Sequence, residues 1–283
     1  MNKTRAEHLP IEKLRPFEGH PFKVADNEEM DQLVESIMTQ GVLTPLVVRL
    51  LDNGEYEVIS GHRRLHACKR AGIESVPALI TEMDRDTAAI ALVDSNLHRE
   101  HILPSEKAFA YKLKADAMKQ YGKTNLGQVV PNYDSTRTTA VIGEVNGESY
   151  KTVQRYIRLT NLIPGILQMV DDGRIALTPA VEISYLTNRE QRELLETMEC
   201  EDCTPSLSQA IQLKLLSQSG NLDIYTIFDI LTQRKPNQQE KISFRTEDVR
   251  KFFPKSYTTA QMQDVILRLL EGYQRQRQRS QER

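Results

Sequence analysis

A glycine and two arginines stand where a strand pattern gives way to a helix pattern. The β-rich run that ends at Ile59 is followed directly by Ser60-Gly61-His62-Arg63-Arg64. Free backbone N–H groups at a helix start attract anions, glycine permits close approach of a ligand, and arginine forks bind phosphate. These residue types predict a phosphate-binding turn. A solvated basic helix start is the alternative interpretation.

A second polar set lies at a predicted helix end, in Asp94-Ser-Asn-Leu-His-Arg-Glu100. Asn96 and Arg99 are three residues apart and share a helix face. An amide and a guanidinium in that position can meet a phosphate or a magnesium-bound phosphate. The alternative is a C-terminal cap in which Arg99 favours the helix dipole. The sequence has no GxxxxGK[ST] motif, which excludes a P-loop ATPase.

A third set, residues 140–160, has the pattern of a helix-turn-helix. Asn146-Gly147 separates two short helical patterns, and Ser149 can cap the second. The first short helix carries Val141, Ile142 and Val145. The inward positions of the second are Val153, Tyr156, Ile157 and Thr160. The predicted DNA contacts are Ser149, Tyr150, Lys151, Thr152, Gln154, Arg155 and Arg158. Such a composition suits a recognition helix, but an amphipathic helix with a solvated basic face would match it too.

The three cysteines predict reduced thiols. Cys200-Glu-Asp-Cys203 has zinc-ligand spacing, but a closed structural site needs four ligands and the sequence has no second pair. Two cysteines at a helix end are therefore the preferred interpretation.

The charge is unevenly distributed along a chain whose net charge is −2. From residue 104 to 160, nine Lys and Arg stand against five Asp and Glu, a net of +4. From residue 182 to 202, two stand against seven, a net of −5. This separation suits one basic face on a neutral molecule.

The elements that must position these residues divide the chain into an α/β part and an all-α part. Strand signals at 9–14, 46–48, 56–59 and 76–80 alternate with helix signals at 30–38, 63–71 and 86–98. Asp26 is the expected cap of the first helix, and Asp52-Asn-Gly54 predicts a hairpin. After Pro104 only helix signals remain, with Ser105 as the expected first cap and an exposed loop over 122–138.

The 283 residues, of which 39 % are hydrophobic, fit a multidomain protein. We expect an α/β domain at 1–103, a helical domain at 104–217, a small C-terminal unit at 218–273 and a disordered tail at 274–283. No apolar run approaches the roughly 20 residues that span a bilayer. We therefore expect a cytoplasmic protein without a membrane partner.

The order of these motifs resembles the ParB partition family. The matching residues run from Gly41-Val-Leu-Thr-Pro-Leu-Val-Val48 through Gly61-His-Arg-Arg64, Val76-Pro-Ala78, Asn96-Leu-His-Arg-Glu100 and Pro104-Ser-Glu106 to the helix-turn-helix. The resemblance covers about residues 8–215, and the ordered set is more specific than any one motif. It favours DNA binding for the segment 140–160.

The resemblance implies a protein that binds a palindromic centromere-like site on double-stranded DNA as a homodimer, with a ParA-type ATPase as a candidate partner. It also implies association with the nucleoid or a plasmid, and CTP with Mg²⁺ as the ligand that closes a sliding clamp. The implied nucleotide contacts are Thr44, Pro45, Leu46, Gly61, His62, Arg63, Arg64, Asn96 and Arg99, with Asn96 also a candidate Mg²⁺ ligand.

Two departures from the family pattern concern catalysis. His62 and Ser95 stand where the family usually has glutamates, so the resemblance implies nucleotide binding with at most slow CTP hydrolysis. Asp94 could supply a carboxylate in place of the one missing at Ser95, but it lies one residue before that position. Residues 218–283 do not match the family's usual dimerisation segment, but Met262, Val265, Ile266 and Leu269 lie at helical spacing and form a candidate dimer seam.

Other functions remain in competition. A transcription regulator could keep the fold and bind DNA without nucleotide. The N-terminal fold also resembles sulfiredoxin, but Gly61, in Ser60-Gly-His-Arg63, stands where that chemistry needs a cysteine. A nuclease would need clustered carboxylates for its metals, which the sequence lacks.

Overall fold

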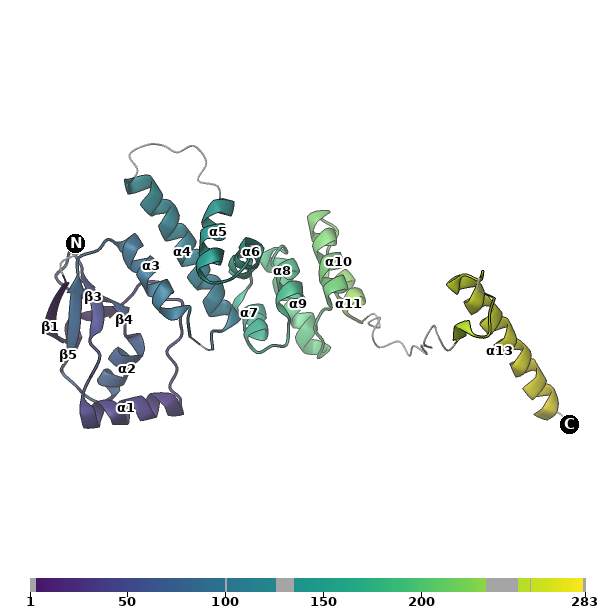
Figure 1. Cartoon of the computed structure of the whole chain (residues 1–283), viewed down its shortest axis with the longest axis horizontal. Helices are drawn as coiled ribbons and strands as arrows, with labels where there is room; N and C mark the ends of the chain where they lie inside the picture. Colours follow the sequence, from purple (N-terminus) through teal and green to yellow (C-terminus); the bar gives the residue numbers. More distant parts are fainter. Residues whose placement is uncertain (1–3, 100, 126–134, 233–248, 255, 282–283) are drawn as a thin grey trace. The chain divides into compact units, whose positions relative to one another are not determined.

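The structure, a computed structural model, describes residues 4–99, 101–125, 135–232, 249–254 and 256–281. It divides into one compact unit that ends at Gln233 and a second unit from Arg234. The described residues contain no helix long and apolar enough to cross a membrane. Figure 1 shows the elements in chain order, coloured along the sequence.

The N-terminal part is an α/β domain with a mixed five-stranded sheet in the order β1-β5-β3-β4-β2. β1 pairs antiparallel with β5, β3 parallel with β5 and antiparallel with β4, and β2 parallel with β4. The elements are β1 (Thr4–Pro10), the 3-10 helix η1 (Ile11–Lys13), β2 (Leu14–Pro16), α1 (Glu28–Gln40), β3 (Leu46–Leu50), β4 (Tyr56–Ser60), α2 (His62–Arg70), β5 (Ser75–Thr81) and α3 (Arg85–Asn96).

Side chains alternate across the sheet and so create two cores. Leu46, Val48 and Val58 pack with residues of α1 and α2, such as Met30 and Leu65. Their strand neighbours Val47 and Ile59 pack in a second cluster with α3 and α4. The sheet thus holds α2 against one face and α3 against the other. The start of α2 and the end of α3, which carry the predicted phosphate contacts, are therefore both fixed by this sheet.

The helical part of the first unit begins with α4. Its elements are α4 (Pro104–Asn125), α5 (Ser135–Val145), α6 (Tyr150–Leu159), α7 (Pro164–Asp171), α8 (Leu177–Ile183), α9 (Asn188–Cys200), α10 (Leu207–Gln218) and α11 (Ile224–Thr232). Tyr111 of α4, Ile142 of α5 and Val153 of α6 share one buried cluster. A larger cluster joins α6 through α11.

α11 lies in the first unit, although the sequence placed its residues with the C-terminal unit. Ile227, Ile230 and Leu231 are buried in the same cluster as Leu194 of α9 and Leu213 of α10. The Gly220 turn marked a break in the helix pattern, but it is a connection between packed helices and not a domain boundary.

The second unit contains α13 (Thr259–Gln281). This helix includes residues 274–281, which the sequence assigned to a disordered tail. Arg and Gln have high helix propensity even where they have no hydrophobic face to bury. Most of the loop expected at 122–138 lies outside the described residues, and the helices on either side of it, α4 and α5, extend into that range.

Two expected helix caps differ in the structure. Asn27, not Asp26, accepts the backbone N–H of Met30 at the start of α1, while Asp26 pairs with His66 and Arg70. Ser105 lies inside α4 and donates to Asp171 of α7. Asp26 and Ser105 each bind a partner that is distant in sequence, which a local pattern does not reveal, and so neither acts as the expected cap.

Candidate functional site

The start of α2 has the geometry of an anion site. Gly61 adopts φ 106°, and no side chain caps the helix. A Cβ at this position would lie 3.0 Å from Leu46 Cγ and 3.1 Å from Arg64 Nη2. Only glycine fits such a turn without strain. The first N–H groups of α2 therefore lack side-chain partners, and they are the donors that an anion would use.

Arg64 connects this turn to the segment before β3. Its Nη1 donates to the backbone carbonyls of Thr44 and Pro45, at 2.9 Å for Pro45. Burial lowers the pKa of this half-buried guanidinium. The structure thus brings Thr44, Pro45 and the buried Leu46 next to the start of α2, as the sequence predicted for one site.

Arg63 and Arg99 add positive charge at the same place. Arg63 donates to Glu29 of α1 at 3.0 Å in an exposed pair, which is a weak attachment. The Arg99 guanidinium lies 5.4 Å from the centroid of the Phe22 ring. Burial lowers the pKa of Arg99, the Glu106 carboxylate opposes that shift, and repulsion from Arg63 lowers the pKa further. An anion bound near both guanidinium groups would relieve the repulsion between them.

Asn96 does not face this group of cations in the structure. Its side chain is 5 % exposed, and its amide donates to the Leu92 carbonyl at 2.7 Å and to Ser95 Oγ at 3.2 Å. Asn96 is therefore turned back onto its own helix, while Arg99 lies beyond the helix end. The sequence placed the two on one phosphate-facing surface, and the structure separates them.

The metal-binding capacity of the described side chains is small. Among the described residues no group of three or more His, Cys, Asp or Glu could hold a metal ion. Asp94 pairs with Lys114 instead. A Mg²⁺ ion at this site would have to take most of its ligands from phosphates and water, as nucleotide-bound Mg²⁺ commonly does. Asn96, the candidate Mg²⁺ ligand, is turned back onto its own helix in this structure. Cys200 is exposed and Cys203 half-buried, and neither forms a disulfide bond within the described residues.

His62 stacks against a second histidine that sequence reasoning missed. The His20 and His62 ring centroids are 3.8 Å apart. His62 Nε2 accepts the Phe17 N–H at 3.4 Å. Burial, with repulsion from His20 and Arg99, lowers the pKa of His62 to about 3. The side chain is therefore a neutral structural group at pH 7. The motif His20-Pro-Phe22 offered only a weak signal, because its partner lies 42 positions away.

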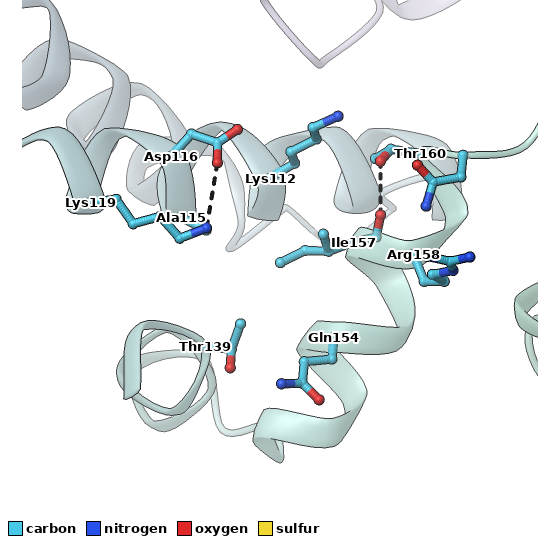
Figure 2. Close-up of a pocket in the computed structure, with 10 residues that line it drawn as sticks. Lys112, Ala115, Asp116, Lys119, Thr139, Gln154, Ile157, Arg158 and Thr160 are labelled. Atoms are coloured by element: carbon cyan, nitrogen blue, oxygen red, sulfur yellow. Dashed lines mark hydrogen bonds and ion pairs between the residues drawn. The ribbon is translucent and has the colours of Figure 1, made fainter. Parts of the chain in front are cut away.

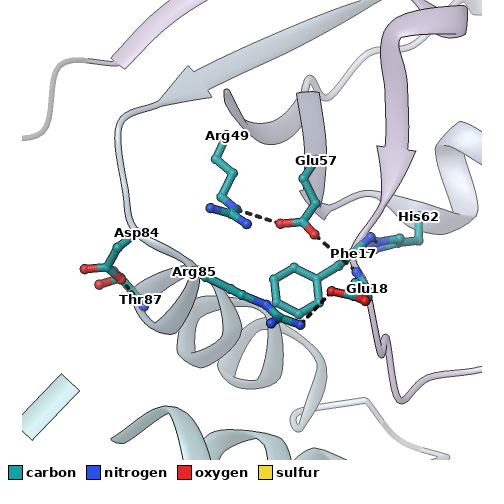
Figure 3. Close-up of polar contacts among 8 residues, drawn as sticks. All are labelled: Phe17, Glu18, Arg49, Glu57, His62, Asp84, Arg85 and Thr87. Atoms are coloured by element: carbon teal, nitrogen blue, oxygen red, sulfur yellow. Dashed lines mark hydrogen bonds and ion pairs between the residues drawn. The ribbon is translucent and has the colours of Figure 1, made fainter. Parts of the chain in front are cut away.

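Glu57 anchors the loop that supplies His20. Figure 3 shows its carboxylate between Arg49 and the backbone of Glu18. Glu57 Oε2 accepts from Arg49 Nε at 2.6 Å, and Oε1 accepts the Glu18 N–H at 3.2 Å. Arg85 of α3 holds the Glu18 carboxylate at 2.9 Å. Glu57 is 5 % exposed. The sequence offered one sign of the buried Arg49–Glu57 pair, which is the charged Glu57 inside the β-rich run 56–59.

A second candidate site lies on α5 and α6. Gly147 adopts φ 68° in the turn between them, and Asn146 Nδ2 donates to the Ile142 carbonyl at 2.7 Å. Ser149 caps α6 by accepting the Thr152 N–H at 3.1 Å. A Cβ on Gly143 would lie 2.5 Å from the Glu148 carbonyl oxygen, so the turn closes tightly against α5.

The side chains of α6 divide between a packed and an open face. Val153 is fully buried, and Tyr156 and Ile157 are half-buried. Several predicted DNA contacts are exposed together: Ser149, Tyr150, Lys151, Gln154 and Arg155. Thr152 is half-buried, and its hydroxyl lies 2.8 Å from that of Ser149. The open face offers amide, hydroxyl and cationic donors on one helix.

Arg158 is not a free outward side chain, in contrast to the prediction. Its Nε donates to Ser184 Oγ and its Nη2 to the Ser184 carbonyl, both at 3.1 Å. Its guanidinium also lies 3.9 Å from the centroid of the Tyr185 ring. Helical spacing placed Arg158 on the outer face, but the residues that follow α8 hold its guanidinium there.

A buried network fixes the start of α6 to α4. Tyr111 Oη donates to Glu148 Oε2 at 2.9 Å, and Lys107 pairs with the other oxygen of the same carboxylate. Lys107 Nζ also lies 4.8 Å from the Tyr156 ring centroid. α6 is therefore held at both ends, by α4 and by α8, and its open face is presented by a rigid support.

Comparisons with known proteins find similarity to partition and nucleoid occlusion proteins. The family model described as the ParB N-terminal domain matches residues 1–97. The chain is 28 % identical over 257 residues to the probable chromosome-partitioning protein ParB of Vibrio cholerae, covering 90 % of this chain and 82 % of the relative. It is 31 % identical over 192 residues to the nucleoid occlusion protein of Listeria monocytogenes, covering 68 % of this chain and 61 % of that relative.

A solved structure from Caulobacter crescentus also matches part of the chain. It is the C-terminally truncated chromosome-partitioning protein ParB complexed with CTP-γ-S. The match has a TM-score of 0.32 and 24 % identity, and covers 69 % of this chain and 99 % of the other.

Proposed function

We propose that this chain, whose residues 1–97 match the ParB N-terminal domain, is a DNA-binding partition protein of the ParB family that binds a palindromic centromere-like site as a homodimer. CTP with Mg²⁺ is the ligand that closes it into a clamp. The names of the relatives support a role on the chromosome, and the open face of α6 is the observation that carries DNA binding.

In this proposal, α5 and α6 form a helix-turn-helix and α6 is the recognition helix. Its first turn and its open face would enter the major groove, where Gln154 and Arg155 can reach base edges. One such helix reads only a few base pairs, so specificity against a genome requires two half-sites and therefore a dimer.

The DNA-binding proposal is tested with Arg155. Replacing Arg155→Ala removes an exposed side chain that can make a bidentate base contact worth roughly 1–3 kcal/mol. Fluorescence anisotropy should then show specific affinity about tenfold weaker or more, with non-specific affinity less changed. Arg192→Ala on α9, also exposed, is the matched control. An equal loss on all sequences would show that Arg155 touches only phosphate.

The nucleotide proposal rests on the start of α2. Free N–H groups after Gly61, together with Arg63, Arg64 and Arg99, can meet the charge of a triphosphate, and the family favours CTP. Contacts with Arg99 would tie the end of α3 to α2, and closure would draw on phosphate contacts made only in the closed form.

Calorimetry with each of the four nucleoside triphosphates and Mg²⁺ tests this part. Of the four triphosphates, only CTP should bind. Arg64→Ala should abolish this binding, because it removes a hydrogen-bond donor to the phosphates and frees the segment 44–46. The isolated 104–233 fragment should keep its intrinsic DNA affinity. If no triphosphate binds in the presence of specific DNA, the chain is a plain DNA-binding regulator that keeps the ParB fold.

Hydrolysis of CTP should be slow or absent. The neutral His62 accepts a backbone N–H, so it is not available to activate water, and Ser95 Oγ donates to the Leu92 carbonyl at 2.9 Å. Losing a general base or a water-positioning group typically costs about 10²–10⁴-fold. Brisk phosphate release would show that another group, such as Asp94, replaces the missing carboxylates.

A further inference from the structure

A polar hollow lies between α4 and α6, beside the open face of the proposed recognition helix. Figure 2 shows α4 on one side of it and α5 and α6 on the other. Its lining includes three cations, Lys112 and Lys119 of α4 and Arg158 of α6, and one anion, Asp116. Gln154, a predicted base contact, forms part of the α6 wall.

The positive charge of the hollow is only weakly compensated. Within the described part of the chain, Lys112 has no ion pair. Lys119 Nζ lies 3.8 Å from Asp116 Oδ1, and these side chains are 40 % and 59 % exposed, so the pair contributes little. The three cations against one carboxylate give the lining a net charge of +2.

Arg158 is held in position at the rim of this hollow. Ser184 accepts from its Nε and Nη2, and Tyr185 stacks against it. Nη1 has no hydrogen-bond partner among the described residues and remains as a donor. A guanidinium that is already oriented loses less side-chain entropy when it binds a ligand.

The lining suits a phosphate better than a whole nucleotide. It contains no aromatic ring on which a base could stack, whereas charge and hydrogen-bond donors are sufficient for a phosphate. On a duplex, a helix in the major groove has the sugar–phosphate backbone on either side of it. The α4 wall stands where that backbone would pass if Gln154 reaches a base.

We propose that this hollow receives a phosphate of the DNA backbone, with Lys112 and Lys119 of α4 and Arg158 of α6 as its ligands. The inference rests on the proposed recognition role of α6. It makes α4 a second DNA-binding element, which sets the register of α6 on the duplex while base contacts supply sequence discrimination.

The test measures how DNA affinity depends on salt. Each phosphate contact that is lost lowers the slope of log affinity against log salt by about 0.9. Lys112→Ala with Lys119→Ala should lower the slope by about 1 to 2 over roughly 50–200 mM salt. The loss should be equal on specific and non-specific DNA, so that the ratio of the two affinities stays the same.

Two double variants serve as controls. Lys112→Arg with Lys119→Arg keeps the charge and should keep the slope. Lys13→Ala with Lys69→Ala removes two exposed lysines from the α/β domain and should also leave it unchanged. If wild-type protein binds DNA and the double alanine variant has the same slope, the hollow is not a phosphate site. If wild-type protein binds no DNA, the proposed function itself fails.

Discussion

His62 should make the free energy of unfolding depend on pH. It is 9 % exposed, and burial holds its pKa at about 3, far below the ordinary 6.5. The folded state therefore binds no proton at this site between these two values, whereas the unfolded state does. Stability should fall as pH falls below about 6.5, at up to about 1.4 kcal/mol per pH unit, with the dependence ending near pH 3.

Chemical denaturation between about pH 7.5 and 5.5 measures this effect. His62→Gln keeps an acceptor for the Phe17 N–H and removes the titration, so the decline in stability should become shallower. His8→Gln on β1, where the side chain is exposed, is the control and should leave the profile as it is. Parallel profiles for wild type and His62→Gln would contradict a neutral buried imidazole.

At the scale of elements, Arg155 and Arg158 are neighbours on one helix with different roles. Arg158 joins α6 to α8 by two hydrogen bonds and a stacked ring. Arg158→Ala should therefore lower the free energy of unfolding by about 1–3 kcal/mol, since hydrogen bonds of charged groups contribute in this range. Arg155→Ala should change it by less than about 0.5 kcal/mol.

Urea unfolding monitored by circular dichroism distinguishes these two variants. Arg158→Lys is a useful third variant, because an ammonium keeps the charge but cannot make the same paired contacts. It should recover only part of the lost stability. Equal stability of Arg155→Ala and Arg158→Ala would mean that the contacts with Ser184 and Tyr185 contribute nothing.

Local patterns were enough to predict most elements near the sites. Hydrophobic alternation located β3 and β4, and the cap and turn signals located α6, because these depend on neighbours in sequence. The glycine turn at the start of α2 followed from the same reasoning. What the sequence could not supply were contacts between distant residues, such as the Arg64 contact with Pro45, the His20–His62 stack and the attachment of Arg158 to α8.

The domain boundaries illustrate the same limit at the scale of the molecule. Ile227 and Leu231 complete a core built by α6 to α10. Their local sequence does not indicate the domain in whose core they are buried. Of the proposed dimer seam, Met262 is 3 % exposed and so is already packed inside its own unit. The exposed apolar side chains of α13 are Leu267, Leu269, Leu270 and Tyr273.

Assembly should therefore depend on α13, through a surface that keeps Leu269 of the seam that the sequence indicated but leaves out the buried Met262. Leu269→Glu places a charge within these exposed apolar side chains and should shift the protein from dimer to monomer by light scattering. Specific DNA affinity should fall with it, because two half-sites would no longer be bound together. Gln263→Glu adds a charge at an exposed polar position of the same helix and is the control.

Truncation after Gln233 is the complementary test. It removes the whole second unit and keeps α11, whose buried side chains complete the helical core. A shorter chain ending at Ser217 would lose those side chains and confuse instability with lost assembly. A 1–233 protein that stays dimeric would place the dimer interface within the first unit.

The two cations that flank Tyr185 make this position suitable for a fluorescent probe. Arg158 lies 3.9 Å and Lys214 Nζ 4.1 Å from the centroid of this ring, and the chain contains no tryptophan. Tyr185→Trp would thus introduce a single indole, the ring that binds cations best, at the far end of α6. Its emission, free of any other indole signal, would report the binding of a DNA phosphate at Arg158 in real time.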